Sequence, residues 1–588
     1  MLGDVQTPSD GGKLQRVSAF SNSAVSCDTT SEVVVVSGEQ APSGMLDGGK
    51  LQASPEGKSL GMDASTPVNI PLLTKLLKGW PHASFVINGF SQGFKFHFSG
   101  FECGFETRNS MAANLNPEAV DQKLSQEIDL NRIAGPFDYP PLPDFKCSPL
   151  SLREKSEPGK FRLLHNLSYP YDETSVNGGI DQKYKTVKYA SIQTALHLIN
   201  KLGRKCYMGK ADIKSAYRLV PIHPSQHHLL GFKWRNKYYY DKYLPMGMAE
   251  SCAIFETISD GLVYIMKSTG VDNIVKVLDD FLFLESSKPD CDCALQKFNF
   301  LCKELAIPLV EAKTSKFSAQ QIVFLGVQLD TYAMTASLPS DKLCRYTKDA
   351  SEFLKQETTS LHELQSLIGK LQFATSVIPI GRPFLRRLID ATKERSHRSV
   401  IDITEDMRAD ITMWKTFLGS YNGTSIITPY PICTDYSINL FSDASNIGYG
   451  GTYGSNWIQG CWNDTWRGLN IAVRELYPIL ILVKMFAHLW SNQTVCFHCD
   501  NQAIVASLNK QRARNSTIMT LLRPLVLHLM LTNVKFKVVY IKSKDNIIAD
   551  AISRFQEDQD LLSRYGLKPY PSPVPRHLQP EVIIPSKE

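Results

Sequence analysis

The chain has 588 residues, 43% of them hydrophobic, and a net charge of +6, so it holds enough apolar surface for several globular cores and is not a wholly disordered protein. Its 13 cysteines have no repeated metal-ligand spacing and no even framework, which argues against zinc modules and against a disulfide-bonded secreted domain. The sequence starts without a signal-peptide pattern and its longest apolar stretch is too short to cross a bilayer, so we expect a soluble intracellular protein, cytoplasmic or nuclear, with no membrane partner.

The amino-terminal segment differs from the rest of the chain in composition and charge. Residues 1–70 hold four basic and eight acidic residues, are rich in Ser, Gly, Thr and Asp, and contain the sequence Asp-Gly-Gly-Lys-Leu-Gln twice. We predict a disordered leader over 1–70 and an amino-terminal extension over 71–135. The remaining chain carries a net charge of +10, which favours a polyanionic partner such as nucleic acid.

A proline-rich stretch at 136–149 marks the entrance to the next domain, because each proline biases its own residue and the one before it away from helix. From there to residue 335, short β-rich runs are mixed with helical patterns. This mixture predicts an α+β domain built on a small antiparallel sheet. The β-rich runs are 205–211, 237–243, 273–284 and 322–329.

Three acidic residues of this domain adjoin apolar runs. Asp212 follows one, and the doublet Asp279-Asp280 separates two others, as expected when two strands meet at a tight turn. Asp is also common in hairpin turns for conformational reasons alone. Carboxylates beside buried strands are nevertheless costly unless cations neutralise them, and divalent metal ions are the usual solution.

Residues 336–431 change to a helical pattern. Ser360 and Glu363 form a capping-box signature, and apolar residues then recur at helical spacing. From 432 to 556, β-rich segments alternate with helices, which predicts a separate α/β domain, and a proline-rich tail follows at 557–588.

A second set of acids lies in the α/β domain, each member at the edge of an apolar segment. Each alone is also explained as a helix cap or a strand-edge residue, and Asp500 stands where an N-cap would be. Four in succession favour a second metal-dependent site for phosphoryl transfer. The set comprises Asp443, Glu475, Asp500 and Asp550.

The order of the motifs resembles two known families. Between the first acidic segments lies Pro245-Met246-Gly247, and this order resembles the palm of reverse transcriptases; the match extends to Ser148-Pro149-Leu150, Phe161-Arg162-Leu163 and Phe324-Leu325-Gly326. The second set resembles ribonuclease H in residue type, order and spacing. The resemblance implies a polymerase right hand, with fingers, an α+β palm and a helical thumb, followed by an α/β ribonuclease H-like domain.

The resemblance also implies roles in the first site. Asp212, Asp279 and Asp280 would hold two Mg²⁺ ions, with Mn²⁺ as the alternative metal, which activate the primer 3′-hydroxyl. Arg162 would contact the triphosphate, and Tyr217 matches the aromatic gate that excludes a ribose 2′-hydroxyl.

Three further residues complete the predicted nucleotide site. Met246 and Gly247 belong to it through the Pro-x-Gly element. Lys313 is a candidate for protonating the pyrophosphate, although a solvated surface lysine is an equally good interpretation. Phe324-Leu325-Gly326 would grip the primer, and a plain buried strand is the alternative.

In the second site, the resemblance implies that the four carboxylates hold two metal ions that activate water against the RNA strand of an RNA:DNA hybrid. The sequence departs from the retroviral pattern at three places. Val277 stands where retroviral enzymes have Tyr, Met246 replaces Gln, and no His precedes Asp550, where Lys542 and Lys544 occur instead.

A more specific sequence resemblance is to DIRS-type retroelements, in which a tyrosine recombinase replaces the integrase. It is found in the segments 132–137, 167–170, 324–330 and 381–388. No recombinase, aspartic protease or zinc-knuckle pattern is visible, so we expect a recombinase from the same element as a separate partner.

The leading hypothesis is an enzyme that copies retroelement RNA into DNA and degrades the RNA strand, with RNA template, DNA primer, RNA:DNA hybrid and dNTPs as partners. A catalytically inactive nucleic-acid-binding remnant is the alternative from another class. A host repair or telomere polymerase would not explain the fused ribonuclease H pattern. The sequence does not predict an oligomeric state.

Overall fold

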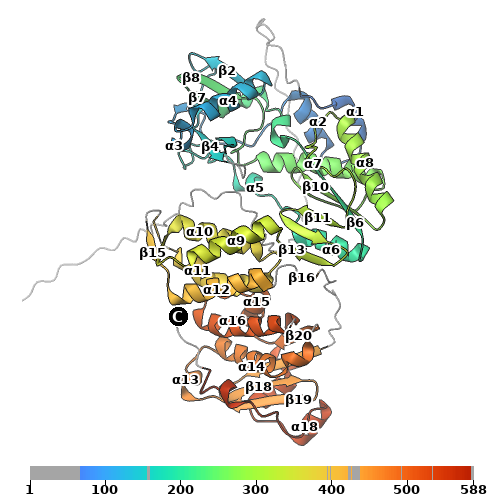
Figure 1. Ribbon diagram of the computed structural model, residues 1–588, viewed down its shortest axis with the longest axis vertical. Helices are drawn as coiled ribbons and strands as arrows, with labels where there is room; N and C mark the ends of the chain where they lie inside the picture. The colour runs from blue at the N-terminus through green and yellow to red at the C-terminus, as the bar shows by residue number, and fades with distance from the viewer. Residues whose placement is uncertain are drawn as a thin grey trace, which may run out of the picture. The chain divides into compact units, whose positions relative to one another are not determined.

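A computed structural model describes residues 66–583, except 155–158, 394, 397–398, 421–424, 427–437, 492 and 533 (Figure 1). Most of the expected leader, residues 1–65, lies outside the described residues. The chain divides into two compact units, the first of Met1–Ala195 with Tyr207–Ala319 and the second of Leu196–Cys206 with Gln320–Glu588. The finer domain boundaries stay predictions. Within the described ranges, no helix has the length and apolarity needed to span a membrane.

The palm of the first unit is a three-stranded antiparallel sheet in the order β6-β10-β9. Every residue from Phe281 to Leu284 in β10 is buried, because helices cover the sheet. Helix α8 packs on β6 and β10 and begins at Lys288; the Ser287 side chain caps it, and a proline lies in its first turn. The elements are β6 (Tyr207–Asp212), α7 (Ser251–Ser268), β9 (Ile274–Val277), β10 (Asp280–Glu285) and α8 (Lys288–Glu304).

The amino-terminal extension belongs to the same core as the palm. Helix α1 (Ile70–Leu76) is capped by Asn69, and α2 (Ala83–Gln92) packs against α7. Leu73 and Phe90 lie in one buried cluster with Phe255 of α7. The extension is therefore an integral layer of the first unit.

The fingers contain a five-stranded sheet in the order β1-β3-β7-β8-β2 and a separate hairpin, β4–β5. Helix α4 (Pro117–Asp129) packs on β2 and β5, and its residues Val120 and Leu124 are buried with Phe232 and Trp234 of the sheet. The remaining elements are β1 (Phe105–Glu106), α3 (Met111–Asn114), β2 (Ile133–Phe137), β3 (Lys146–Cys147), β4 (Leu150–Glu154), β5 (Phe161–His165), α5 (Gln182–Lys185), η1 (Ala216–Leu219), η2 (Pro224–Leu230), β7 (Gly231–Trp234) and β8 (Lys237–Asp241).

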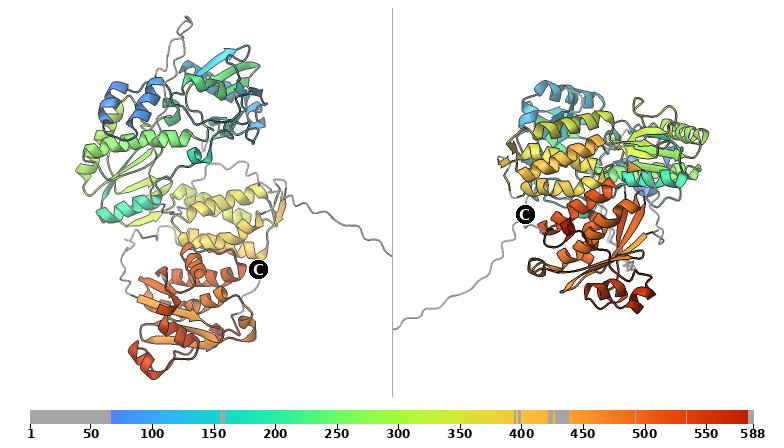
Figure 2. Two further views of the ribbon diagram at one scale, coloured as in Figure 1. Left: turned by 180° about the vertical axis from the view of Figure 1, so that it is seen from behind. Right: turned by 60° about the horizontal axis from the view of Figure 1, so that its bottom comes forward.

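The second unit begins with the end of α6 (Ile192–Leu202), a four-stranded sheet β11-β12-β13-β16 and a group of helices in which α9 packs against α10 and α12 (Figures 1 and 2). The predicted capping box is confirmed, since Ser360 and Glu363 hydrogen-bond each other's backbone N–H at the start of α10. The elements are β11 (Gln321–Phe324), β12 (Val327–Asp330), β13 (Thr335–Ser337), α9 (Ser340–Phe353), β14 (Thr358–Ser360), α10 (Leu361–Ala374), η3 (Pro379–Leu385), α11 (Arg386–Ala391), β15 (Val400–Asp402), α12 (Glu405–Ser420) and β16 (Ser425–Ile426).

The interpretation of Phe324-Leu325-Gly326 as a plain buried strand is wrong. Leu325 and Gly326, with φ of 46° and 75°, form the turn between β11 and β12, where Phe324 pairs with Val327. Two consecutive residues in the left-handed region produce a tight hairpin, which alternation of apolar residues alone does not reveal. The role of this turn as a primer grip stays a prediction.

The α/β domain contains a five-stranded mixed sheet in the order β19-β18-β17-β20-β21, with β17, β20 and β21 parallel and β17, β18 and β19 antiparallel. Helix α14 packs on β17 and β18 and against α16, and it is buried almost throughout. The fold-class prediction of a polymerase right hand followed by a separate α/β domain is confirmed, whereas the assignment of that domain to the ribonuclease H type stays a prediction. The elements are β17 (Ile438–Ala444), β18 (Gly448–Tyr453), β19 (Asn456–Cys461), α13 (Asp464–Arg467), α14 (Ile471–Phe486), η4 (Ala487–Trp490), β20 (Thr494–Cys499), α15 (Gln502–Lys510), α16 (Ser516–Leu531), β21 (Lys535–Tyr540), η5 (Ser543–Asp545) and α17 (Ile547–Ser553).

The proline-rich tail packs back on the α/β domain up to residue 583. It contains α18 (Gln559–Arg564) and η6 (Arg576–Leu578). Tyr477 of α14 donates a hydrogen bond to the carbonyl of Leu578, and the Trp466 indole donates to the carbonyl of Pro580. The aromatic residues of the domain therefore hold the tail through their polar atoms.

Candidate active sites

The palm hairpin brings the first three acids to one end of its sheet. Asp280 is the register partner of Val277 on one side and of Asp212 on the other. The two-residue turn between β9 and β10 is tight because Leu278 adopts a φ of 54°. The turn places Asp279 at its tip, where its carbonyl accepts the Ile213 N–H at 3.0 Å.

These three carboxyl groups crowd one another. Burial, a hydrogen bond to Asp212 and the charge of Asp279 raise the pKa of Asp280 to about 7. Burial also raises the pKa of Asp279, with Asp212 adding to the effect. The Lys313 ammonium lies 2.9 Å from an Asp212 oxygen. A partly buried cluster with this excess of negative charge fits divalent cations, because oxygen-ligated metals neutralise such clusters.

A buried ion pair between α7 and β9 stabilises the hairpin. Glu256 of α7 accepts the Leu278 N–H at 3.0 Å and lies 2.8 Å from the ammonium of Lys276 in β9. Lys276 also lies 2.8 Å from Asp260 and donates to the Ser259 hydroxyl at 2.9 Å. The turn that carries the acids is therefore held to one face of α7.

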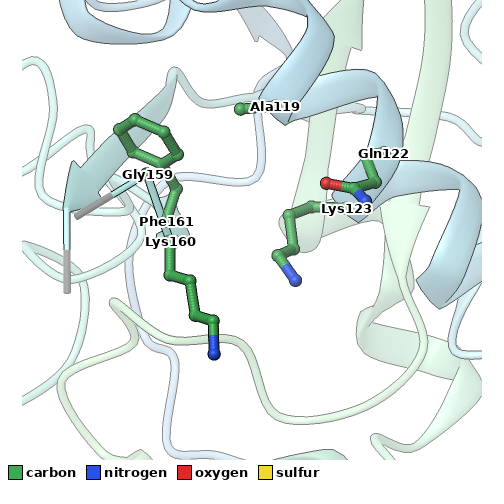
Figure 3. A pocket seen from close by; sticks show the side chains of 6 residues that line it. All are labelled: Ala119, Gln122, Lys123, Gly159, Lys160 and Phe161. Atoms are coloured by element: carbon green, nitrogen blue, oxygen red, sulfur yellow. The ribbon is translucent and has the colours of Figure 1, made fainter. Parts of the chain in front are cut away.

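Arg162 lies on β5 of the fingers hairpin. Its positive charge partly offsets the rise in the pKa of Asp279 that burial causes. The guanidinium thus lies within electrostatic reach of the palm acids. Elsewhere on the fingers, Lys123 and Lys160 line a cavity of about 220 Å³, and their side chains point the same way in Figure 3. The two lysines at this cavity give it a positive charge that suits phosphate groups.

The Pro-x-Gly element packs tightly on the end of β5. The Met246 carbonyl accepts the His165 N–H at 3.0 Å. Gly247 has a φ of 133°, and a Cβ there would lie 2.0 Å from the His165 carbonyl oxygen, so only glycine fits. Asn177 donates to the Gly247 carbonyl at 2.8 Å. Met246 and Gly247 are therefore fixed in place, as a binding surface requires.

Tyr217 lies in η1, directly downstream of Asp212. Its hydroxyl lies 3.0 Å from the Cys252 thiol of α7. Burial, aided by Cys252 and Asp279, raises the pKa of Tyr217, so its hydroxyl stays protonated. The structure thus brings the acids, Arg162, Lys313 and Tyr217 into one neighbourhood of the first unit.

The second set of acids converges from four separate elements. Asp443 lies near the end of β17, Glu475 on α14, Asp500 directly after β20 and Asp550 on α17. Ligand atoms of Glu475 and Asp500, together with the Cys499 thiol, all lie within 4.8 Å of one another. The N-cap of α15 is Asn501, so Asp500 is not used as a helix cap.

The second set is also electrostatically strained. Burial raises the pKa of Asp443 to about 6, and the charges of Asp500 and Asp550 add to the shift. Burial, Asp443 and Asp500 raise the pKa of Glu475 well above its usual value. One oxygen of Glu475 is buried and has no hydrogen-bond partner among the described residues. A buried, unpartnered carboxylate oxygen beside other acids fits a metal ligand.

Hydroxyl groups and one arginine orient the second set. Ser553 donates to Asp443 at 2.6 Å, and Ser543 donates to Asp500 at 2.7 Å. The Arg554 guanidinium donates to Asp550 at 2.8 Å. Lys542 and Lys544 flank Ser543 in the segment that replaces the expected histidine.

Comparison with known proteins places the first site in a family. Residues 155–329 match the family described as reverse transcriptase (RNA-dependent DNA polymerase). This segment contains Arg162, Tyr217 and the three palm acids. It is a reverse transcriptase domain.

The chain is similar to parts of viral and transposon polyproteins. The chain is 22% identical to a putative enzymatic polyprotein of Cassava vein mosaic virus over 400 residues, 66% of this chain and 58% of the relative. It is 23% identical to the retrovirus-related Pol polyprotein from transposon opus of Drosophila melanogaster over 381 residues, 62% of this chain and 36% of the relative. The chain thus spans between about a third and three fifths of these two curated relatives.

Solved structures of foamy viral protease-reverse transcriptase also match. One, in complex with double-stranded DNA, has a TM-score of 0.45 and 14% identity and covers 83% of this chain and 84% of its own. Another, in complex with an RNA/DNA hybrid, has a TM-score of 0.42 and 15% identity and covers 84% of this chain and 65% of its own.

Sequence reasoning missed the residues that support the acids of the reverse transcriptase domain. Lys276 carried a usable signal, since a charged residue inside the apolar run of β9 demands a buried partner. Glu256 and Cys252 carried none, because helical spacing alone does not show which face of α7 meets the hairpin. No sequence pattern indicated the role of Ser553 in the second site, because its acceptor, Asp443, is 110 positions away in sequence.

Proposed function

We propose that this chain is an RNA- and DNA-directed DNA polymerase with ribonuclease H activity, which copies retroelement RNA into DNA and degrades the RNA strand of the hybrid. The observation that carries the proposal is the convergence of Asp212, Asp279 and Asp280 within the reverse transcriptase domain. RNA template, DNA primer, RNA:DNA hybrid and dNTPs are the proposed partners. The excess positive charge outside residues 1–70 supports polyanionic substrates.

In the polymerase reaction, Asp212, Asp279 and Asp280 would hold two Mg²⁺ ions. These ions would lower the pKa of the primer 3′-hydroxyl and neutralise charge on the phosphates. Arg162 would bind the triphosphate oxygens through its planar guanidinium. Lys313, whose pKa is raised by its hydrogen bond to Asp212, stays charged and would donate a proton to the departing pyrophosphate.

In the nuclease reaction, Asp443, Glu475, Asp500 and Asp550 would hold the second metal pair. The raised pKa values of Asp443 and Glu475 support this role, because bound cations would offset both the burial and the neighbouring negative charges that raise them. Ser553 and Ser543 orient two of the four carboxylates. Lys542 and Lys544 would contact the phosphate backbone.

The relation to DIRS-type retroelements is the finer part of the proposal. It rests on the amino-acid sequences of the segments 132–137, 167–170, 324–330 and 381–388. A tyrosine recombinase encoded beside this chain is the expected partner. Sequencing of the flanking genomic DNA tests this, and an integrase reading frame in place of a recombinase contradicts it.

Primer extension on an RNA template with Mg²⁺ tests the polymerase. The parent enzyme should extend a DNA primer, and Asp279→Asn should lower the rate by roughly 10³-fold or more, since it removes a charged ligand at the reacting centre. Asp272→Asn, an exposed acid at the foot of the same hairpin, is the matched control and should keep activity. A folded parent without activity favours the non-catalytic remnant.

A further inference from the structure

The side chain of Tyr217 is held by the first turn of α7. Its hydroxyl oxygen lies 3.0 Å from the Cys252 sulfur. One helical turn further on, Phe255 packs edge-on against the tyrosine ring, with centroids 5.9 Å apart and planes at 78°. Two neighbouring residues of one helix face therefore contact both the ring and its polar end.

The backbone beneath Tyr217 is anchored independently. Arg218, the next residue, is mostly buried and lies 2.7 Å from Asp241 and 2.8 Å from Glu127. The Val220 N–H donates to the Tyr217 carbonyl at 3.2 Å. With the backbone held in this way, the remaining freedom of Tyr217 lies in its side-chain torsions, and the contact with Cys252 restricts them.

The start of α7 also contacts the Pro-x-Gly element. The Ser251 hydroxyl donates to the Pro245 carbonyl at 3.2 Å. Glu250, the residue before the helix, lies 2.6 Å from His97 of the amino-terminal extension and accepts the His97 N–H at 2.8 Å. Cys252 thus lies on a turn that is itself fixed from two sides, which makes it a rigid point of attachment for the tyrosine.

We propose that Cys252 is a specificity-determining positioning residue, whose thiol holds the Tyr217 ring in the place where it collides with the 2′-hydroxyl of a ribonucleotide. This inference rests on the proposed polymerase function and on the gate role that the resemblance to reverse transcriptases implies for Tyr217. Without the thiol, the ring gains freedom to tilt away from the sugar. Discrimination between dNTPs and rNTPs then falls, while the metal-binding acids are untouched.

Single-nucleotide incorporation of dATP and ATP on one primer–template tests this proposal, with selectivity measured as the ratio of the two kcat/KM values. Cys252→Ala should lower that ratio by about 3- to 10-fold, the size of one lost hydrogen bond. Cys252→Ser keeps a hydroxyl partner and should retain most of the selectivity. Cys302→Ala, which removes a buried thiol from the same core, is the matched control and should not change the ratio.

A double-mutant cycle separates the hydrogen bond from simple packing. Tyr217→Phe removes only the hydroxyl and should lower selectivity about as much as Cys252→Ala. Adding Cys252→Ala to Tyr217→Phe should then have no further effect. An equal additional loss in the double variant, or an unchanged ratio in Cys252→Ala alone, overturns the proposal.

Failure of this inference is distinguishable from failure of the proposed function. A folded parent that incorporates neither nucleotide overturns both, whereas an active parent whose selectivity ignores Cys252 overturns this inference alone.

Alkylation gives a second measurement on the parent protein. Iodoacetamide forms a thioether with Cys252 and releases iodide, while the thiol proton passes to solvent. Peptide mass spectrometry should show slower labelling of Cys252 when primer–template and dATP are bound. Equal labelling rates with and without dATP would show that the thiol is not shielded by a Tyr217 side chain held against a bound nucleotide, which contradicts the proposal.

Discussion

The two acidic sites achieve similar charge clustering by different structural routes. The palm acids lie on adjacent strands of one antiparallel sheet, where Asp280 pairs directly with Asp212. The second set is collected from two strands and two helices. A site built at one end of a small sheet depends on strand pairing and turn geometry, whereas a site assembled from four elements depends on the packing of the whole domain.

The support beneath the acids differs in the same way. The palm hairpin is held by the buried ion pair of Glu256 and Lys276. The second set is oriented by the hydroxyls of Ser553 and Ser543. Breaking a buried ion pair by removing one partner is costly, because the charge that remains is buried without water or a counter-ion. Loss of a hydroxyl costs only a single hydrogen bond. The palm should therefore be the more fragile of the two toward loss of its supporting residues.

The largest expected effect is the functional separation of the sites. Asp443→Asn should lower cleavage of labelled RNA in an RNA:DNA hybrid by roughly 10³-fold or more, because a charged ligand is lost. Primer extension by the same variant should match the parent. Asp464→Asn, an exposed acid in the same domain, serves as control. Undiminished RNA cleavage by Asp443→Asn would show that the four-acid assignment is wrong.

Breaking the ion pair should have the next largest effect. Lys276→Met leaves Glu256 buried without its cation, which should cost about 3–5 kcal/mol of unfolding free energy and weaken primer extension. Adding Glu256→Gln removes the stranded charge and keeps an acceptor for the Leu278 N–H, so the double variant should recover most of the stability. Chemical denaturation measures both variants. A double variant no more stable than Lys276→Met contradicts the pairing.

A smaller effect is expected from the hydroxyl support. Ser553→Ala should lower RNA cleavage by about 10- to 100-fold, the range for groups that orient metal ligands, and leave primer extension unchanged. Ser563→Ala, on an exposed position of α18, is the control. If both serine variants cleave RNA at the parent rate, Asp443 needs no orientation by Ser553.

The smallest effect concerns the stability of the metal-free protein. The folded pKa of Asp280 is about 7, above its ordinary 3.8, so the stabilisation that protonation provides is present at low pH and lost as pH rises through 7. Asp280→Asn should therefore raise the Tm at pH 8 by a few degrees, with a gain that shrinks toward pH 4. Added Mg²⁺ should stabilise the parent more than the variant. A lower Tm for the variant at pH 8 without metal contradicts the crowding of the palm acids.

Local patterns predicted local structure well. The capping box at Ser360 and Glu363 is present, and the β-rich segments expected between 432 and 556 include β20, Thr494–Cys499. The acidic doublet lies at a hairpin turn, as its flanking apolar runs predicted. The turn at Leu325 and Gly326 was missed, because an apolar run with one central glycine is typical of a continuous strand as well as of a tight hairpin.

By itself, the sequence determined which residues carry charge at the ends of apolar segments, and hence the identity and order of the seven candidate acids. Only the tertiary structure decided what surrounds them: Lys276 and Glu256 under the palm turn, Cys252 against Tyr217, and Ser553 on Asp443. The physical reason is the sequence separation over which the interactions act. Turns, caps and strand periodicity depend on neighbours within a few residues, whereas a hydrogen bond from a helix to a distant strand depends on how whole elements pack, which no local pattern encodes.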